Sequence, residues 1–349
     1  MILLNPGPVN VSPRVTAALA RGDLCHREPE CAALLDRIRA RLLEAFVPAG
    51  GHTAVLVTGS GTAALEMAVT SVLSERGRLV IAANGVYGER MAAIAAAARL
   101  PHTVLAGRWT EPPDLARVEE ALGAPDAEAL AVVHHETTTG LRNPIPELVA
   151  LARRHGKLVL VDSVSGLAGD PLDVVTCDLV AGTAGKCIQA FPGIAFVLVR
   201  DEVLARLAAH PARSLYLSLS TYVKHPMPFT PAVQLAYALD EALAELLEET
   251  VAGRIARYAA AAAELRAGFA RLGLECVLPP AWRSNTITSL RLPPGRTYAD
   301  LHDGLKARGF VIYEGQGWFA REAFRVANMG ALTRADLARF LAALGEVLG

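Results

Sequence analysis

The sequence predicts an α/β fold, with a large domain built on a mostly parallel sheet and a smaller α+β domain after it. Two observations lead to this prediction. Between Thr53 and Val199, short runs rich in Val, Leu and Ile alternate with amphipathic helical stretches, a pattern typical of parallel strands covered by helices on both faces. After Pro231 the pattern changes to a long helical stretch followed by short strands and helices.

Seven strands are expected in the first region, and a doubly wound sheet places its ligand at the carboxyl ends of such strands. The predicted strands are Ala54–Val57, Leu79–Ala82, Thr103–Leu105, Leu130–His134, Leu158–Asp162, Leu179–Ala181 and Ile194–Val199. The helices expected between them are Thr62–Leu73, Glu89–Ala98, Leu115–Leu122 and Ile145–His155.

The second region is expected to begin with a helix that runs to about Leu272 and breaks once near Gly253. Strands are then predicted at Glu275–Leu278, Thr286–Leu292, Val311–Tyr313 and Phe324–Ala327, and helices at Ala299–Arg308 and Arg334–Leu348. The predicted domains are residues 15–235 for the large domain and residues 236–349, with an N-terminal arm of residues 1–14, for the small one.

Composition excludes several classes of protein. The 349 residues are 52% hydrophobic and 20% charged, with a net charge of −1, which suits a sizeable buried core and gives no electrostatic reason to expect nucleic acid. No apolar run reaches the length of a membrane span. Five cysteines without a C-x-x-C pair argue against a disulfide framework or zinc, and His134 and His135 have no third metal ligand. We expect a cytoplasmic enzyme of small molecules, without a metal.

The segment Gly59–Thr62 follows the first strand and opens a helix. Glycines let the backbone approach an anion, and the free N–H groups of a helix N-terminus can hold a phosphate. The segment also fits the start of the dinucleotide pattern G-x-G-x-x-A, but Ala82–Asn84 stands where that pattern needs an acid for a ribose hydroxyl. A nicotinamide-dependent oxidoreductase is therefore the weaker alternative, and a purely structural turn stays open.

Asp162 ends one predicted strand, and Lys186 lies just past another. A carboxylate at a strand end points into the ligand crevice, although alone it could be a helix N-cap. Small residues surround Lys186, and burial disfavours the charged form of a lysine, which favours imine formation. A carboxylate that pairs with a protonated pyridine nitrogen keeps a pyridoxal ring an electron sink. The pair indicates pyridoxal 5′-phosphate (PLP), with a core-edge lysine as the alternative.

Three further positions are candidates for contact with a cofactor or substrate. Tyr87 follows the second strand, where its ring could stack on a cofactor or simply pack at a helix start. Thr137–Thr139 offer hydroxyls at a strand end, or form a turn before Gly140. Arg325 lies in an apolar strand and needs an anionic partner, which could be a substrate or a structural carboxylate.

Taken together, these segments resemble the class V aminotransferases of fold type I over nearly the whole chain. The matching segments are Asn5–Pro8, Gly59–Thr62, Asn84–Arg90, Glu136–Gly140, Val161–Ser163, Lys186, Phe229–Thr230 and Phe324–Gly330. Within that family, the segments His135–Gly140, Lys186–Gln189 and Gly309–Tyr313 are most similar to the 2-aminoethylphosphonate:pyruvate aminotransferases.

The resemblance implies a role for each candidate. Lys186 would carry PLP as a Schiff base, with Asp162 on the pyridine nitrogen and Tyr87 stacked on the ring. The remaining implied contacts are Ser60, Gly61, Thr62 and Thr183 near the phosphate, Thr139 near the ring, Thr230 on the phosphate of the partner subunit in a homodimer, and Arg325 on the acid group of the substrate. Gly7 and Arg27 are further candidates for substrate contact.

The expected reaction is a ping-pong transamination of 2-aminoethylphosphonate with pyruvate, which gives phosphonoacetaldehyde and alanine or runs in reverse. Two departures keep an alanine–glyoxylate or serine–pyruvate type of enzyme as the alternative. Cys25–Glu30 is more similar to those relatives, and Pro228 stands where the phosphonate enzymes are expected to have arginine. A cysteine desulfurase would need a cysteine on a mobile loop, and Cys276 is expected in a strand.

Overall fold

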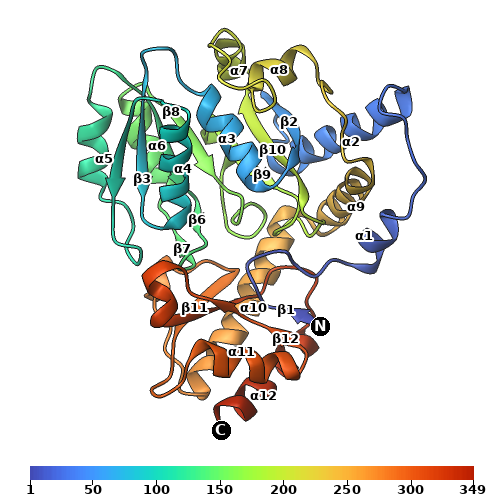
Figure 1. Cartoon of the computed structure of the whole chain (residues 1–349), viewed down its shortest axis with the longest axis vertical. Coiled ribbons are helices and arrows are strands. Elements are labelled where there is room, and N and C mark those ends of the chain that lie inside the picture. Colours follow the sequence, from blue (N-terminus) through green and yellow to red (C-terminus); the bar gives the residue numbers. More distant parts are fainter.

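A computed structural model describes residues 1–349, and its largest element is a seven-stranded sheet (Figure 1). The strands lie in the order β2-β10-β9-β8-β5-β3-β4. Their bounds are β2 His52–Gly59, β3 Arg78–Ala83, β4 His102–Ala106, β5 Ala127–Val133, β8 Leu158–Asp162, β9 Leu179–Thr183 and β10 Gly193–Arg200. Only β10 runs antiparallel to its neighbours β2 and β9. The predicted mostly parallel, seven-stranded sheet is confirmed.

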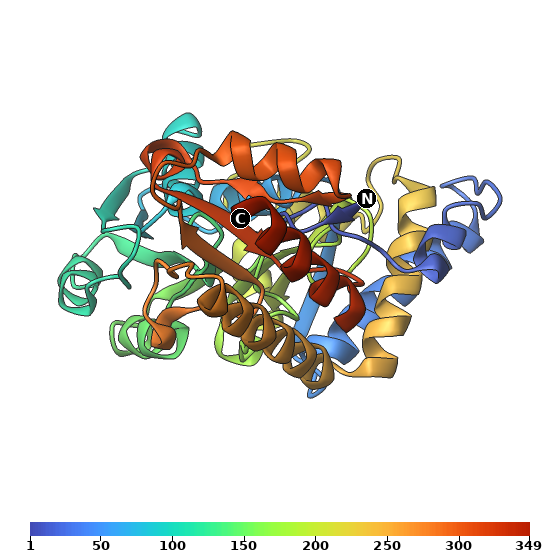
Figure 2. The ribbon, with the colours of Figure 1, turned by 90° about the horizontal axis from the view of Figure 1, so that it is seen from below.

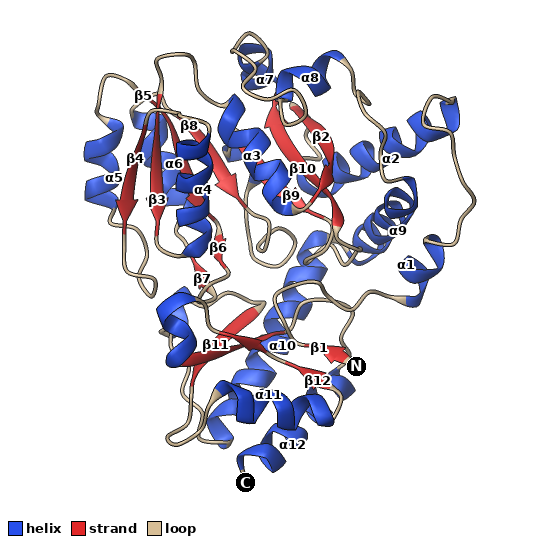
Figure 3. Ribbon diagram, in the orientation of Figure 1, coloured by secondary structure: helices blue, strands red, loops and turns tan.

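Helices cover both faces of this sheet (Figure 3). On one face lie α3 (Gly61–Ser71), α4 (Val86–Ala97), α7 (Asp201–Leu207) and α8 (Leu219–Lys224). On the other lie α2 (Pro29–Phe46), α5 (Leu115–Leu122), α6 (Ile145–Arg154) and α9 (Val233–Glu249). Successive residues of β3 enter opposite cores, Leu79 on the first face and Val80 on the second, because side chains alternate along a strand. No helix is long and apolar enough to cross a bilayer.

A smaller part of the molecule lies below the carboxyl ends of the parallel strands (Figures 1 and 2). Its three-stranded antiparallel sheet has the order β11-β14-β13, and a third core packs this sheet against α10, α11 and α12. The bounds are α10 Val251–Arg271, β11 Ile287–Arg291, α11 Tyr298–Ala307, β12 Phe310–Val311, β13 Tyr313–Glu314, β14 Ala323–Ala327 and α12 Arg334–Leu348, with short 3-10 helices η2 (Pro280–Trp282) and η3 (Gly317–Arg321).

The N-terminus belongs spatially to this smaller part, because β1 (Ile2–Leu3) pairs in parallel with β12. The chain then passes the ends of β8 and β9 before α1 (Pro13–Ala18) packs against α9. The N-terminal segment therefore lies between the two parts. The residue boundaries given above for the two domains stay a prediction.

The structure differs from the predicted elements in three details. The long helix breaks once, as expected, but at Thr250, three residues before Gly253. Thr250 has a left-handed backbone (φ 67°), and its hydroxyl accepts a hydrogen bond from Gly253 N and so caps α10. The expected strand Val311–Tyr313 is divided, because its first half pairs with β1 and its second half with β14. Segment Glu275–Leu278 forms only one isolated bridge, Cys276 to Leu290.

Candidate active site

A cavity of about 250 Å³ lies where β8 and β9 end and α3 begins. Eight residues expected at the site line it together, from five separate stretches of the chain. They are Gly7, Ser60, Gly61, Thr62, Tyr87, Asp162, Thr183 and Lys186. The carboxyl ends of neighbouring parallel strands meet at one edge of a sheet, which is why residues so distant in sequence converge here.

The N-terminus of α3 forms one wall of this cavity. Ser60 is the N-cap residue, but its side chain makes no capping hydrogen bond, so its hydroxyl stays available. A Cβ at Gly61 would lie 2.7 Å from Cγ1 of Val164, so only glycine lets the helix begin this close to the segment after β8. Arg90 donates to the Thr62 hydroxyl at 3.2 Å. A helix N-terminus with an arginine beside it is suited to a phosphate.

Asp162 occupies the last position of β8 and is only 3% exposed. One carboxylate oxygen accepts a hydrogen bond from Val164 N at 3.0 Å, and no protein group donates to the other. Burial raises the pKa of this carboxyl to about 6, against the opposing effects of the Val164 N–H and the nearby positive charges of Arg90 and Lys186. A cationic N–H donor in the cavity would stabilise the ionised carboxylate.

Lys186 lies three residues beyond β9, and its amine donates to the carbonyl of Pro6. Burial lowers the pKa of this amine to about 8, and Arg325 and Arg90 contribute to that lowering. A Cβ at Gly7, which has φ 98°, would lie 2.7 Å from the amine nitrogen. The N-terminal segment can pass the lysine only because residue 7 is glycine. An unprotonated amine is the form that attacks an aldehyde.

Tyr87 is in the first turn of α4, and burial raises the pKa of its phenol. The guanidinium of Arg90 lies 4.6 Å from the ring centroid. In the same region, the buried carboxylate of Glu136 accepts hydrogen bonds from the N–H of Gly88, the residue after Tyr87, at 3.3 Å and from the Thr138 hydroxyl at 2.6 Å. Glu136 thereby caps α4, whose own N-cap residue is glycine.

Arg90 and Glu136 were not singled out from the sequence, although both lie in matched segments. The available signals were a glutamate two residues after a predicted buried strand and an arginine one helical turn beyond Tyr87.

Arg325 lies on β14 with no exposed surface. Its guanidinium donates to Glu314 O at 3.0 and 2.7 Å, to Thr137 O at 2.8 Å and to Oε1 of Gln316 at 3.2 Å. The ring of Tyr313 lies 5.0 Å from its Cζ. Arg325 forms no ion pair with a carboxylate, and burial lowers the pKa of its guanidinium. It does not line the 250 Å³ cavity, but its charge helps to lower the pKa of Lys186.

Comparison with known proteins assigns this arrangement to a family. The profile described as Aminotransferase class-V matches residues 14–340. The chain belongs to the class-V aminotransferase family. It is 38% identical to the 2-aminoethylphosphonate–pyruvate transaminase of Syntrophobacter fumaroxidans and 35% identical to that of Klebsiella pneumoniae, over 99% of this chain and 96% and 97% of the relatives. The alanine–glyoxylate aminotransferase of a Nostoc species superimposes with a TM-score of 0.92 at 27% identity, covering 100% of this chain and 95% of that one.

Membership of the class-V family implies PLP as the cofactor, and the cavity around Lys186 fits it. The cavity contains the Lys186 amine, whose pKa is lowered, and the buried Asp162 carboxylate, one oxygen of which accepts no hydrogen bond from the protein. It also contains the N-terminus of α3, which can lie close to Val164 only because residue 61 is glycine. These features match the aldehyde, the ring nitrogen and the phosphate of the cofactor. The fold type I architecture expected from the sequence is confirmed by the Nostoc aminotransferase.

Besides Arg325, three candidate residues lie outside this cavity in the single chain. The Thr139 hydroxyl is buried and donates to Trp109 O at 3.1 Å. Thr230 is exposed beside Phe229, near α8. Arg27 is exposed in the loop between α1 and α2.

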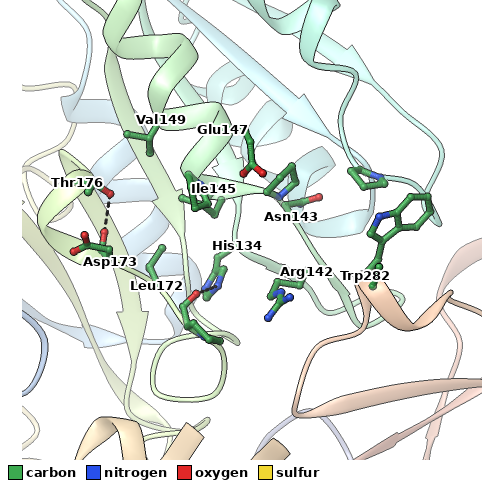
Figure 4. Close-up of a pocket in the computed structure, with 15 residues that line it drawn as sticks. His134, Arg142, Asn143, Ile145, Glu147, Val149, Leu172, Asp173, Thr176 and Trp282 are labelled. Carbon is green, nitrogen blue, oxygen red and sulfur yellow. Dashed lines mark hydrogen bonds between the residues drawn. The ribbon is translucent and has the colours of Figure 1, made fainter.

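A larger cavity, of about 650 Å³, lies elsewhere, between α6 and η2 (Figure 4). It contains none of the residues expected to bind the cofactor. Arg142 points into it without a hydrogen-bond partner, and Trp282 stands at its edge. His134 lies on its wall with both ring nitrogens bonded, to the Ser163 hydroxyl and Pro171 O. The chemistry of the lining therefore favours the smaller cavity as the candidate active site.

Proposed function

We propose that this aminotransferase moves the amino group of 2-aminoethylphosphonate to pyruvate, which yields phosphonoacetaldehyde and alanine, or catalyses the reverse reaction. One structural observation carries the proposal. Arg325 is a fully buried cation without a carboxylate partner, and it lies close enough to Lys186 to influence its pKa. Both substrates carry an acid group that could pair with this guanidinium. Full-length similarity to two transaminases of that name supports the choice of substrates.

Bound PLP would supply an aldehyde that accepts an amine and a ring that takes up negative charge. We assign Lys186 to two tasks. Its amine attaches the cofactor, and once released it moves a proton to and from the amino-bearing carbon of the substrate. A pKa of about 8 leaves part of this amine unprotonated near neutral pH.

The other residues would orient the cofactor. Asp162 keeps a proton on the ring nitrogen, and Tyr87 packs on the ring. The phosphate would be held by Ser60, Gly61, Thr62 and Thr183 at the start of α3 and the end of β9. Gly7 leaves space for the substrate beside Lys186, and Thr139 would stay near the ring as part of the buried turn that ends at Gly140.

The active enzyme would be a homodimer in which Thr230 completes the phosphate site of the partner subunit. Its position supports this assignment, because Thr230 is exposed and does not line the cavity of its own chain. Tyr216 and Phe229, whose ring centroids are 4.9 Å apart, form a partly exposed aromatic surface beside it.

A donor and acceptor panel with purified enzyme tests the function, scored by the absorbance of the bound cofactor. 2-Aminoethylphosphonate should convert the cofactor to its amine form, and pyruvate should restore it. An alanine–glyoxylate type of reaction is the second candidate, favoured by the segment Cys25–Glu30. If the enzyme ignores 2-aminoethylphosphonate but turns over alanine or serine with glyoxylate, the proposal is wrong and the second candidate holds.

A further inference from the structure

The four hydrogen bonds of Arg325 end on acceptors of two kinds. Glu314 O belongs to β13, which pairs with β14, and Thr137 O belongs to the buried turn after β6 (His135–Glu136). Neither carbonyl can leave the guanidinium without a change in the backbone. The acceptor on Gln316 is a side-chain amide oxygen, on a partly exposed residue before η3. Only this bond can open by rotation of a side chain.

The backbone around Gln316 is anchored independently of that bond. Gly315 N donates to Ala323 O at 3.2 Å, and Gln316 O accepts from Phe319 N at 3.0 Å. Two residues beyond Gln316, the ring of Trp318 lies 5.4 Å from that of Trp109 across the two parts of the molecule. The amide of Gln316 could therefore swing into solvent, where water would satisfy it, while the strand that carries Arg325 stays in place.

The amide oxygen of Gln316 is neutral, whereas the acid group of a substrate is an anion. The guanidinium donates a charge-assisted hydrogen bond to either acceptor, but only an anion adds the attraction between two opposite charges and can accept two parallel N–H bonds. A buried cation without a counter-ion gains more from an anion than from an amide. A phosphonate or carboxylate that reaches Arg325 would therefore displace Gln316 from its Nη1.

We propose that Gln316 is a specificity-determining residue: a neutral placeholder that occupies one arm of the Arg325 guanidinium until the acid group of the substrate displaces it. This inference rests on the proposed function and deepens it. A neutral placeholder keeps the buried guanidinium hydrogen-bonded between turnovers, and it yields to an anion but not to an uncharged group. The amide at position 316 thus favours amines and ketones that carry an acid group.

Changing the charge of the placeholder tests the inference. Gln316→Glu would pair with Arg325 internally, so KM for 2-aminoethylphosphonate and for pyruvate should rise by about tenfold or more, with a smaller change in kcat. Gln316→Ala leaves the arm open, so KM should stay equal or fall by about threefold. The matched control is Glu314→Gln. Glu314 contacts Arg325 only through its backbone, and its exposed side chain makes no hydrogen bond, so KM should stay at the wild-type value.

Binding of methylphosphonate, measured by calorimetry, separates this inference from the proposed function. This probe has the acid group but cannot react. Its Kd should be weakest for Gln316→Glu and equal to or tighter than wild type for Gln316→Ala, whichever amine the enzyme uses. Equal Kd values for Gln316→Glu and wild type, weaker binding by Gln316→Ala, or undiminished binding by Arg325→Ala would each overturn the inference. The proposed function fails separately, if 2-aminoethylphosphonate is not turned over.

Discussion

Two arginines with almost no exposed surface lie in the smaller part of the molecule, and they are held in different ways. Arg254 on α10 forms an ion pair with Glu249 and donates to Cys187 O at 3.0 Å and Ile188 O at 3.4 Å. Arg325 on β14 has only neutral oxygens as partners. Both influence the surroundings of Lys186. Arg254 donates hydrogen bonds to the loop that follows the lysine, and the charge of Arg325 lowers the pKa of the lysine amine.

The difference indicates two purposes for a buried cation. Burial of a charge is costly unless an opposite charge compensates it. In Arg254 the compensation is built into the chain, and the arginine fixes the loop Lys186–Gln189 against α10. Gln189 extends the same attachment, because its amide donates to the Tyr258 hydroxyl and to Gly330 O. In Arg325 no counter-ion is built in, as expected for a residue whose anionic partner is a substrate.

The largest stability difference should come from Arg254→Ala. The substitution leaves Glu249 with Arg257 as its remaining partner and two buried carbonyls without a donor, so the free energy of unfolding should fall by about 3 kcal/mol. KM for the acid substrates should change little in the folded variant, because Arg254 does not receive them. Urea unfolding and steady-state kinetics measure both quantities. A large rise in KM at unchanged stability would contradict the claim that Arg254 is structural and that only Arg325 binds the acid group of the substrate.

Arg325→Ala should instead affect catalysis. We expect kcat/KM for 2-aminoethylphosphonate and for pyruvate to fall together by roughly two orders of magnitude or more, because both lose their cationic partner. Arg325→Lys keeps the charge without the planar geometry and should recover only part of the rate. Simple amines without an acid group serve as the control and should be much less affected. If only the pyruvate half-reaction collapses, the phosphonate is held elsewhere, and Arg27 is the first residue to test.

A smaller effect is expected from Asp162, which resembles Arg325 in lacking a built-in counter-ion. Its pKa rises from 3.8 to about 6 on folding, so the native state holds a proton that the unfolded chain releases, and stability falls as pH rises from about 4 to 6. Asp162→Asn has no such titration. Without cofactor, the variant should equal wild type below pH 4 and exceed it by on the order of 2 kcal/mol above pH 6.

Urea unfolding of the two cofactor-free proteins between pH 4 and pH 7 measures this difference. A stability difference between the two proteins that does not change with pH would show that burial does not raise the pKa of the Asp162 carboxyl.

The sequence predicted the positions that depend on strand ends and missed those that depend on long-range register. Asp162 could be found because it ends an apolar strand, and Lys186 because it follows another such strand after a few small residues. The acceptors of Arg325 could not, because Glu314 reaches it only through the pairing of β13 with β14. The break in the long helix was predicted near Gly253 and not at Thr250, because glycine is the usual signal, whereas here a threonine hydroxyl caps the next helix.

The turn Glu136–Gly140 shows a similar limit. Three consecutive threonines looked equivalent in sequence, but each hydroxyl has a separate structural partner. Thr137 bonds Ser165, Thr138 bonds Glu136 and Thr139 bonds Trp109 O. Which threonine faces the cofactor depends on how Glu136 turns back to cap α4, and local patterns do not encode that geometry.

Borohydride reduction of the PLP-loaded protein, followed by peptide mapping, tests the central claim most directly: the cavity at the ends of β8 and β9 holds the cofactor on Lys186. The reduced cofactor should be found on Lys186 alone, and Lys186→Gln should remain folded but carry no label. The other lysines, Lys157, Lys224 and Lys306, are the internal controls. Stoichiometric label on any of these three, or an unchanged label in Lys186→Gln, would contradict the assignment.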